Sequence, residues 1–336
     1  MKIIYFAQEA WEEGYIKERL PNDDVTVVVG ALQDHPDISD AQAEALSVFV
    51  NSRVGTVELD RFPKLKLIAT RSTGFDHIDL EETKKRNIAV ASVPSYGVNT
   101  VAEFAFALIL ALSRRICEAH ERVSEDGSFS QAGLEGFDLA GKTLGLVGCG
   151  NIGVHTARIA KGFGMNVVVF DVRPDEELAR TVGFEYAELD DLLSRSDIIS
   201  LHVPYNPHTH HLINVNNIAR IKRGAYLINT ARGAVVETDA IVKALEEGIL
   251  AGAGLDVLEE EGEMGEEVNL LVGPHPSEAE LKTVLENHYL MKHPRVIITP
   301  HVAFDTREAI ERILTTTIEN ITAWEKGAPQ NILVIE

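Results

Sequence analysis

The sequence predicts an α/β protein of two domains, the larger of them built on a doubly wound parallel sheet. Short apolar runs alternate with helical patterns along the chain, which is typical of parallel βα units. The chain has 336 residues, and because single hydrophobic cores stop growing at about 250 to 300 residues, we expect two domains. With 45% hydrophobic and 25% charged residues, the composition excludes a collagen, a disordered chain and a disulfide scaffold.

The predicted strands fall into two series separated by a long helix. Apolar runs bounded by turn residues predict the first series at residues 3–6, 25–29, 46–50, 65–69 and 88–93. A long helix is predicted over residues 100–123, with its most apolar part, residues 101–112, buried, and a polar stretch at residues 124–141 follows it. The second series of strands is predicted at residues 143–147, 166–170, 198–203, 225–229, 253–257 and 296–299.

Helices are predicted between the strands of the second series, where apolar residues recur at spacings of three and four. They cover residues 152–162, 189–194, 215–221 and 239–247. An amphipathic helix over residues 306–324 and a short strand at residues 332–335 end the pattern. We therefore expect a smaller domain of residues 1–98 and 302–336, interrupted by a larger domain of residues 99–301.

The charge and the cysteines restrict the partners and the compartment. The formal net charge of −21 repels phosphate backbones and anionic membrane surfaces, so we expect no nucleic acid and no membrane as partner. Cys117 and Cys149 give neither a disulfide framework nor a zinc spacing, and no secretory signal opens the chain, which favours a cytoplasmic location. His208, His210 and His211 cluster without a cysteine or a spaced carboxylate, so we expect no metal.

Residues 143–153 contain an apolar strand, a glycine-rich turn and the start of a helix. In such a turn Gly148 allows the tight bend, Gly150 lets the backbone approach a pyrophosphate, and Gly153 lets the helix pack closely on the strand. The N–H groups of the first helical turn, which contains Asn151 and Ile152, then face the anion. The pattern predicts a dinucleotide site.

Asp171 ends the next predicted strand, eighteen residues beyond Gly153. This is close to the roughly 20-residue interval expected of the acid that binds the ribose hydroxyls. Because a carboxylate there repels a 2′-phosphate, we expect NAD as the cofactor rather than NADP. The alternative interpretation of Asp171 is a helix cap before Arg173 and Pro174. Cys149 is interpreted as a small residue that fills the turn.

Polar side chains follow three further predicted strands. They are Arg232, then Asp256 with Glu261, then His301. Ligands of an open α/β sheet bind beyond the carboxyl ends of its strands, so we expect these side chains to meet over the nicotinamide. Taken singly, the arginine is also explained by a surface ion pair and the histidine by an ordinary loop. The other acids of residues 259–267 are interpreted as a solvated loop.

The sequence resembles the D-isomer-specific 2-hydroxyacid dehydrogenases over nearly its whole length. Besides the glycine turn, the matching motifs lie at residues 71–79, 93–103, 201–204, 229–233, 255–261 and 300–304. The resemblance implies two Rossmann-like domains. A doubly wound NAD-binding domain is then inserted into a smaller, flavodoxin-like substrate domain, with the active cleft between the two.

The resemblance also implies roles for individual residues. His301 is the expected proton donor, Glu261 holds its imidazole in the charged form, and Arg232 grips the substrate carboxylate. Further substrate contacts are assigned to the N–H groups of Thr73 and Gly74, to Tyr96 and to Phe304. The cofactor-binding residues are Gly148, Gly150, Asn151, Ile152, Gly153, Asp171, His202, Val203, Pro204, Thr209, Thr230, Ala231, Arg232, Asp256 and His301.

Within the family, residues 300–306 and the stretch 274–294, interpreted as a long loop, resemble the D-lactate and D-2-hydroxyisocaproate dehydrogenases. The expected reaction is the reversible reduction of a small 2-oxo acid, with pyruvate and D-lactate as the first choice. Glyoxylate or hydroxypyruvate reductase stays open, because Asn51 and Asp305 depart from the lactate-type pattern. A non-enzymatic NADH-sensing corepressor is a third alternative. The apolar segment 102–112 and the polar arm 124–141 predict a homodimer.

Overall fold

The computed structural model describes residues 1–259 and 278–333 and divides the chain into two compact units. The first unit contains Met1–Tyr96 and Asp305–Glu336, and the second contains Gly97–Phe304. The predicted boundaries differ from these by two residues at the first joint, 98 against 96, and by three at the second, 302 against 305. In the described part of the chain, every helix is too short or too polar to cross a membrane.

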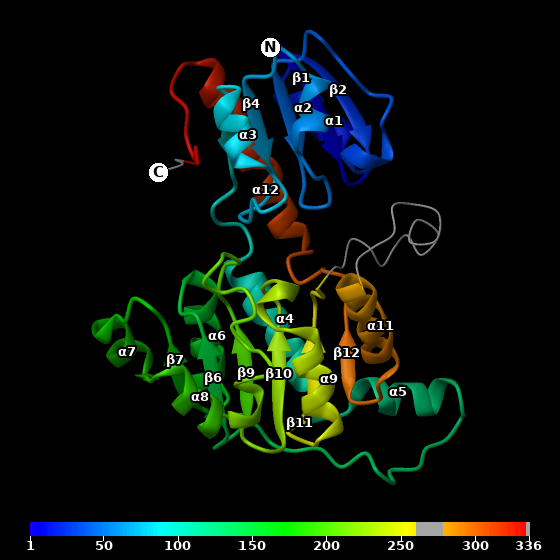
Figure 1. Ribbon diagram of the computed structural model, residues 1–336, viewed down its shortest axis with the longest axis vertical. Helices are drawn as coiled ribbons and strands as arrows, with labels where there is room; N and C mark the ends of the chain where they lie inside the picture. The colour runs from blue at the N-terminus through cyan, green and yellow to red at the C-terminus, as the bar shows by residue number, and fades with distance from the viewer. Residues whose placement is uncertain (260–277, 334–336) are drawn as a thin grey trace. The chain divides into compact units, whose positions relative to one another are not determined.

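The first unit is built on a five-stranded parallel sheet in the order β2-β1-β3-β4-β5 (Figure 1). Its strands are β1 (Lys2–Ala7), β2 (Asp24–Val29), β3 (Ala45–Val48), β4 (Leu67–Thr70) and β5 (Ala89–Ala91). Its helices are α1 (Glu12–Arg19), α2 (Thr56–Asp60), α3 (Leu80–Lys85) and α12 (Arg307–Glu325). Alternate residues of β1 enter opposite cores: Ile3 packs with residues of α1 and α12, and Ile4 packs with residues of α2.

The second unit is built on a seven-stranded parallel sheet in the order β12-β11-β10-β9-β6-β7-β8. Its strands are β6 (Thr143–Val147), β7 (Asn166–Phe170), β8 (Glu185–Tyr186), β9 (Ile198–Leu201), β10 (Ala225–Asn229), β11 (Leu250–Leu255) and β12 (Val296–Ile298). The strand order reverses between β6 and β9. In a doubly wound sheet this reversal opens a crevice at the carboxyl ends of the strands, where ligands bind.

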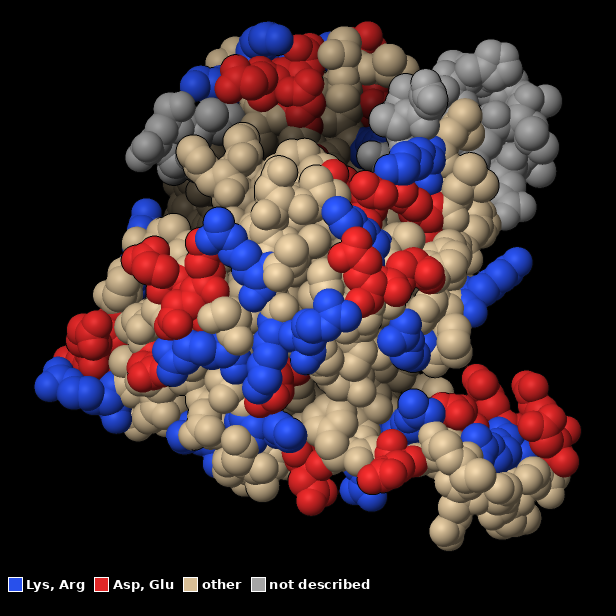
Figure 2. Space-filling view, turned by 60° about the horizontal axis from the view of Figure 1, so that its bottom comes forward, with Lys and Arg blue, Asp and Glu red and all other residues tan. Residues whose placement is uncertain are grey.

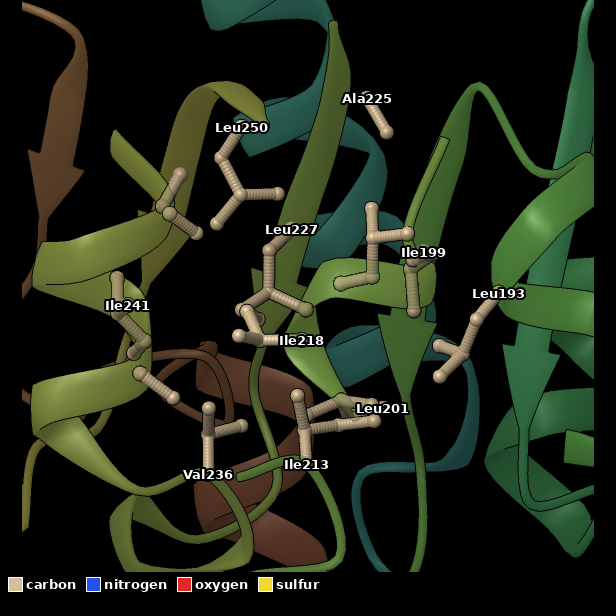
Figure 3. Packing of buried hydrophobic residues seen from close by; sticks show 14 of the residues in the cluster. Leu193, Ile199, Leu201, Ile213, Ile218, Ala225, Leu227, Val236, Ile241 and Leu250 are labelled. Atoms are coloured by element: carbon tan, nitrogen blue, oxygen red, sulfur yellow. The ribbon is translucent and has the colours of Figure 1, made fainter. Parts of the chain in front are cut away.

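Helices cover the sheet of the second unit and complete its cores. They are α4 (Val98–Ser113), α5 (Ile116–Ser124), α6 (Asn151–Gly162), α7 (Glu176–Val182), α8 (Leu189–Arg195), α9 (Thr238–Glu246) and α11 (Glu278–Lys292). Figure 3 shows one core, in which Leu193 of α8 and Ile241 of α9 pack with side chains of β9 and β10. The site at the strand ends is thus carried by a rigid, apolar layer.

The structure corrects the predicted helix over residues 100–123, which is two helices. α4 ends at Ser113, whose carbonyl accepts the N–H of Phe137 at 2.9 Å. A Cβ on Gly136 would lie 2.2 Å from the same carbonyl oxygen, so the arm packs directly on the helix end. Arg115 then adopts a left-handed conformation with φ 50°, which separates α4 from α5. The helical periodicity continues through this break and hides it.

Three further predicted segments also differ from the structure. Residues 215–221 form only the 3-10 turn Ile218–Arg220, in which the N–H groups of Arg220 and Ile221 donate to carbonyls three residues back, at 2.9 and 3.1 Å. The predicted loop 274–294 contains helix α11, whose alanine, leucine, glutamate and lysine residues favour a helix. At residues 332–335 the described part of the chain makes one isolated antiparallel bridge, Ile332 with Ala91, and no named strand.

The surface charge is mixed on the face that Figure 2 shows. Lysine and arginine side chains lie interspersed with aspartate and glutamate there. The net charge of −21 is therefore not gathered into one acidic patch on this face.

Candidate active site

The glycine turn joins β6 to α6 at the point where the strand order reverses. Gly148 has φ 96°, and a Cβ on it would lie 2.7 Å from the carbonyl oxygen of His202. A Cβ on Gly153 would lie 2.3 Å from the carbonyl oxygen of Gly148. A Cβ on Gly150 would have no neighbour within 4 Å. Two glycines are therefore needed by the fold itself, and the third leaves open space in front of the first turn of α6.

Asp171 follows β7 and holds the glycine turn through its carboxylate. One oxygen accepts the N–H of Cys149 at 2.7 Å and the other accepts the N–H of Arg173 at 2.8 Å. The helix-cap alternative is wrong, because Asp175 caps α7. Burial, and next the charge of Asp171, raise the pKa of the Cys149 thiol to about 11. Cys149 therefore stays protonated at neutral pH, consistent with a residue that only fills the turn.

His202 follows β9 and packs beside the glycine turn. Its N–H donates to the carbonyl of Val147 at 2.8 Å, and its Nε2 lies 2.9 Å from the buried hydroxyl of Ser200. Burial lowers the pKa of His202 to about 4, so its ring is neutral near pH 7. Val203, Pro204 and Thr209 continue the loop from His202, and the hydroxyl of Thr209 donates to the carbonyl of Pro204 at 2.6 Å.

Arg232 lies in the turn after β10, next to Thr230 and Ala231. The side chain of Asn229 fixes this turn, because its amide donates to the carbonyl of Arg232 at 2.9 Å and its oxygen accepts the N–H of Ala231 at 3.0 Å. One Arg232 nitrogen donates to the carbonyl of Ala231 at 2.9 Å. A Cβ on Gly233 would lie 2.0 Å from the carbonyl carbon of Leu258, so this turn packs tightly on the chain that follows β11.

Asp256, directly after β11, organises the turn that carries His301. Its side chain is 1% exposed, and its carboxylate accepts the hydroxyl of Thr299 at 2.5 Å and the N–H groups of Val302 at 3.0 Å and Ala303 at 2.8 Å. Its carbonyl accepts the N–H of His301 at 2.9 Å. Burial raises the pKa of Asp256, and these hydrogen bonds together with the charge of His301 oppose the rise.

His301 has a positive φ of 53°, a conformation that costs a side chain of this kind roughly 1 kcal/mol or more. The Asp256 bonds on both sides of the residue maintain it. The ring of Phe304 lies 6.5 Å from the His301 ring, edge to face. The other expected partner, Glu261, lies outside the described residues.

The predicted substrate residues of the first unit follow β4 and β5. The hydroxyl of Thr73 donates to the carbonyl of Val93 at 2.7 Å. Thr73 is exposed and Gly74 is partly exposed, in the turn that follows β4 at the carboxyl end of the sheet. The carbonyl of Tyr96 accepts the side chain of Arg312 from α12 at 2.7 Å.

The role of Glu259 was not predicted, because the acids of residues 259–267 other than Glu261 were interpreted as a solvated loop. The Glu259 carboxylate lies 2.5 Å from Nε2 of His211 and accepts the hydroxyl of Thr238 at 2.8 Å, and its carbonyl accepts the side chain of Asn287 at 2.7 Å. It therefore ties the loop after β9, the start of α9 and α11 to the chain leading toward residue 261. In the described part of the chain, the histidine, cysteine and acidic side chains form no group of three that suits a metal.

The residues of the second unit fit a dinucleotide. The space in front of Gly150 is open, as a pyrophosphate close to the backbone requires. The hydroxyl of Thr230 is buried and has no hydrogen-bond partner in the described part of the chain, so a bound group could satisfy it. The Asp171 carboxylate stands at the end of the neighbouring strand, where a ribose is bound in such sheets.

Comparison with known proteins gives one consistent result. Residues 106–303 match the family model of the D-isomer specific 2-hydroxyacid dehydrogenase NAD binding domain. A 2-hydroxyacid dehydrogenase homolog of Zymomonas mobilis is 41% identical over 85% of this chain and 84% of its own, and a glyoxylate reductase of Thermofilum pendens is 40% identical over 87% and 81%. The D-lactate dehydrogenase of Aquifex aeolicus, solved with NAD and lactic acid, superposes with a TM-score of 0.86 at 38% identity, over 97% of this chain and 96% of its own.

The glycine turn gives a first prediction. Gly150→Ala should leave the melting temperature nearly unchanged, because its Cβ meets no atom, but should weaken NADH binding roughly tenfold or more by filling the space for the pyrophosphate. Gly153→Ala is the matched control and should lower the melting temperature, because its Cβ meets the Gly148 carbonyl. Thermal unfolding and NADH fluorescence titration measure both effects. An unchanged NADH affinity of the folded Gly150→Ala protein would contradict the assignment.

His202 gives a second prediction, on pH. Because the folded protein disfavours protonated His202, its contribution to stability is complete above the ordinary pKa of 6.5 and is lost as the pH falls toward about 4. Between pH 7 and pH 5 the wild-type free energy of unfolding should fall by about 2 kcal/mol more than that of His202→Gln. Urea unfolding at both pH values measures the difference. Equal pH dependence of the two proteins would show that His202 titrates normally.

Proposed function

Because the chain belongs to the D-isomer-specific 2-hydroxyacid dehydrogenases and is therefore an NAD-dependent oxidoreductase acting on a CH–OH group, we propose that it reduces pyruvate to D-lactate reversibly. Because this is a family of enzymes, we reject the non-enzymatic alternative, an NADH-sensing corepressor. The observation that carries the proposal is the turn of His301, held by the buried carboxylate of Asp256 beside the strand end that carries Arg232. A proton donor and a carboxylate-binding cation are what reduction of a 2-oxo acid requires.

His301 and Arg232 have different proposed roles toward the substrate. NADH, when bound, supplies the hydride for the carbonyl carbon. In the proposed reaction the protonated His301 imidazole donates its proton to the carbonyl oxygen, and Glu261 favours the charged ring. The Arg232 guanidinium binds the substrate carboxylate through paired N–H groups, and its charge stabilises the negative charge that grows on the carbonyl oxygen.

The first unit supplies the remaining proposed substrate contacts. The N–H groups of Thr73 and Gly74 bind the carboxylate, and Tyr96 contacts the substrate. Phe304, which belongs to the second unit, lines the space for the substrate's side chain. In the proposed cofactor site, Asp171 binds the ribose hydroxyls. The other residues that contact the cofactor are those of the glycine turn, His202 to Pro204, Thr209, and Thr230 to Arg232.

Glyoxylate reduction is the second candidate, because two of the most similar relatives are glyoxylate reductases that are each 40% identical to the chain. Steady-state kinetics with NADH and pyruvate, glyoxylate, hydroxypyruvate and phenylpyruvate separate the candidates. We expect the highest kcat/KM for pyruvate. A higher value for glyoxylate or hydroxypyruvate selects the second candidate, and no turnover of any of the four contradicts both.

A third prediction concerns the proton donor. His301→Gln should lower kcat for pyruvate reduction by roughly a hundredfold or more, because the amide cannot supply a proton, while the NADH dissociation constant stays close to the wild-type value. His120→Gln, an exposed histidine of α5, is the control and should keep full activity. Stopped-flow reduction and NADH titration measure the two quantities. A fully active His301→Gln enzyme would remove His301 from the mechanism.

We further propose that the enzyme is a homodimer that pairs through α5 and the following arm. None of the residues of α5 is buried, and Ile116, Val123 and Phe129 are 53%, 41% and 86% exposed. Arg122 donates to two carbonyls of the arm, so this apolar surface is held in shape. A second copy covers this apolar surface in the proposed dimer.

Light scattering should give twice the monomer mass for the wild type and the monomer mass for a Val123→Asp, Phe129→Asp double variant.

A further inference from the structure

The turn that follows β4 has donors to offer a substrate carboxylate. In the described part of the chain, the N–H groups of Thr73 and Gly74 donate to no protein acceptor. The turn is nevertheless fixed on one side, because the carbonyl of Ser72 accepts the N–H of Val93 at 3.0 Å and the hydroxyl of Thr73 donates to the carbonyl of Val93.

Behind this turn, three side chains form a continuous line of hydrogen bonds. Nε2 of His77 lies 3.1 Å from Oγ1 of Thr70, and Oγ1 of Thr70 lies 2.7 Å from Oγ of Ser72. The Ser72 hydroxyl lies 2.6 Å from the carbonyl oxygen of Gly74. Thr70 and Ser72 are at most 1% exposed, so water does not compete for these bonds.

The direction of every bond in the line follows from its last member. A carbonyl only accepts, so Ser72 must donate its one proton to Gly74. The Thr70 hydroxyl must then donate to Ser72, and its own oxygen accepts from His77. Nε2 of His77 therefore carries a proton, and the line runs from the ring through both hydroxyls to the Gly74 carbonyl.

This line controls the direction of the turn's own N–H groups. The bond from Ser72 to Gly74 closes a ring that contains the Thr73–Gly74 peptide, so it restricts how that peptide can rotate. The other end of the line is anchored as well, because the carbonyl of His77 accepts the N–H of Val54 at 2.9 Å.

The base of the turn is rigid. Arg71, which lies between Thr70 and Ser72, is 2% exposed, pairs with the buried carboxylate of Glu12 at 2.7 Å and donates to the carbonyl of Phe6 at 2.5 Å. Its backbone N–H donates to the carbonyl of Val48 on β3 at 2.9 Å. None of these bonds involves the hydroxyls of Thr70 and Ser72 or the ring of His77, so the base of the turn keeps them when the line is interrupted.

We propose that His77 is a positioning residue that, through Thr70 and Ser72, orients the Thr73 and Gly74 N–H groups for the carboxylate of the 2-oxo acid. The inference rests on the proposed function, in which these N–H groups bind that carboxylate. His77 touches neither substrate nor cofactor in this role. Its loss acts on substrate binding and leaves the NADH site and the proton donor, which belong to the second unit, as they are.

The test compares variants of the full-length enzyme. His77→Leu and Thr70→Val interrupt the line, and each should raise KM for the 2-oxo acid roughly tenfold, the effect of about one net hydrogen bond. kcat at saturating substrate should change less than about twofold, and NADH affinity should stay unchanged. His77→Gln, whose amide can still donate to Thr70, should restore a KM close to the wild-type value.

Thr83→Val is the matched control, since it removes a buried hydroxyl of the same unit that donates to the carbonyl of Leu80 and does not reach the turn. It should lower the melting temperature without a change in KM. An unchanged KM in Thr70→Val, an equal rise in Thr83→Val, or a His77→Gln enzyme as poor as His77→Leu each overturns the inference. A wild-type enzyme without activity on any 2-oxo acid contradicts the proposed function instead.

Discussion

The arrangement of the second unit's site depends on one buried carboxylate, that of Asp256. Its oxygens receive one hydroxyl and two backbone N–H groups of the turn after β12, and its carbonyl receives the N–H of His301. A histidine with positive φ does not hold that conformation by itself. The cost of burying Asp256 is offset by these bonds, so the same interaction satisfies the carboxylate and fixes the backbone that carries the His301 side chain.

Much of the fold could be predicted because parallel strands have a strong local signal. The strands Thr143–Val147, Asn166–Phe170 and Ala225–Asn229 agree with the prediction residue for residue. The break between α4 and α5 could not be predicted, since the N–H group that satisfies the carbonyl of Ser113 at the end of α4 belongs to Phe137 of a later segment. Apolar periodicity records which face of a helix is buried, and it does not record where a distant segment ends that helix.

The candidate site also contains residues that could be predicted from the sequence and residues that could not. The glycine turn was predicted from its local pattern, and Asp171 from the roughly 20-residue interval that follows such a turn, although the N–H that its carboxylate accepts belongs to Cys149, 22 residues earlier. Glu259 was missed because no characteristic interval links it to its partners His211 and Thr238, which lie 48 and 21 residues away. Asp256 was predicted to contact the cofactor, and this stays a prediction. The structure shows in addition that its carboxylate binds the turn that carries His301, which no spacing in the sequence indicates. Long-range side-chain bonds leave little trace in a single sequence.

The interruption of the first unit by the second has a consequence for synthesis on the ribosome. Leu314, Ile318 and Ile321 of α12 complete the core around Ile3 and Leu67, yet they follow the whole second unit in the chain. The apolar face that β1 and β4 present to α12 therefore stays exposed during translation of the second unit, which is more than half of the protein. The inserted unit, which is continuous in the chain, can finish folding first. We therefore expect chaperones to bind the nascent chain before α12 has been made. A ribosome that stalls before it reaches α12 would keep the apolar face of β1 and β4 exposed for the longest time.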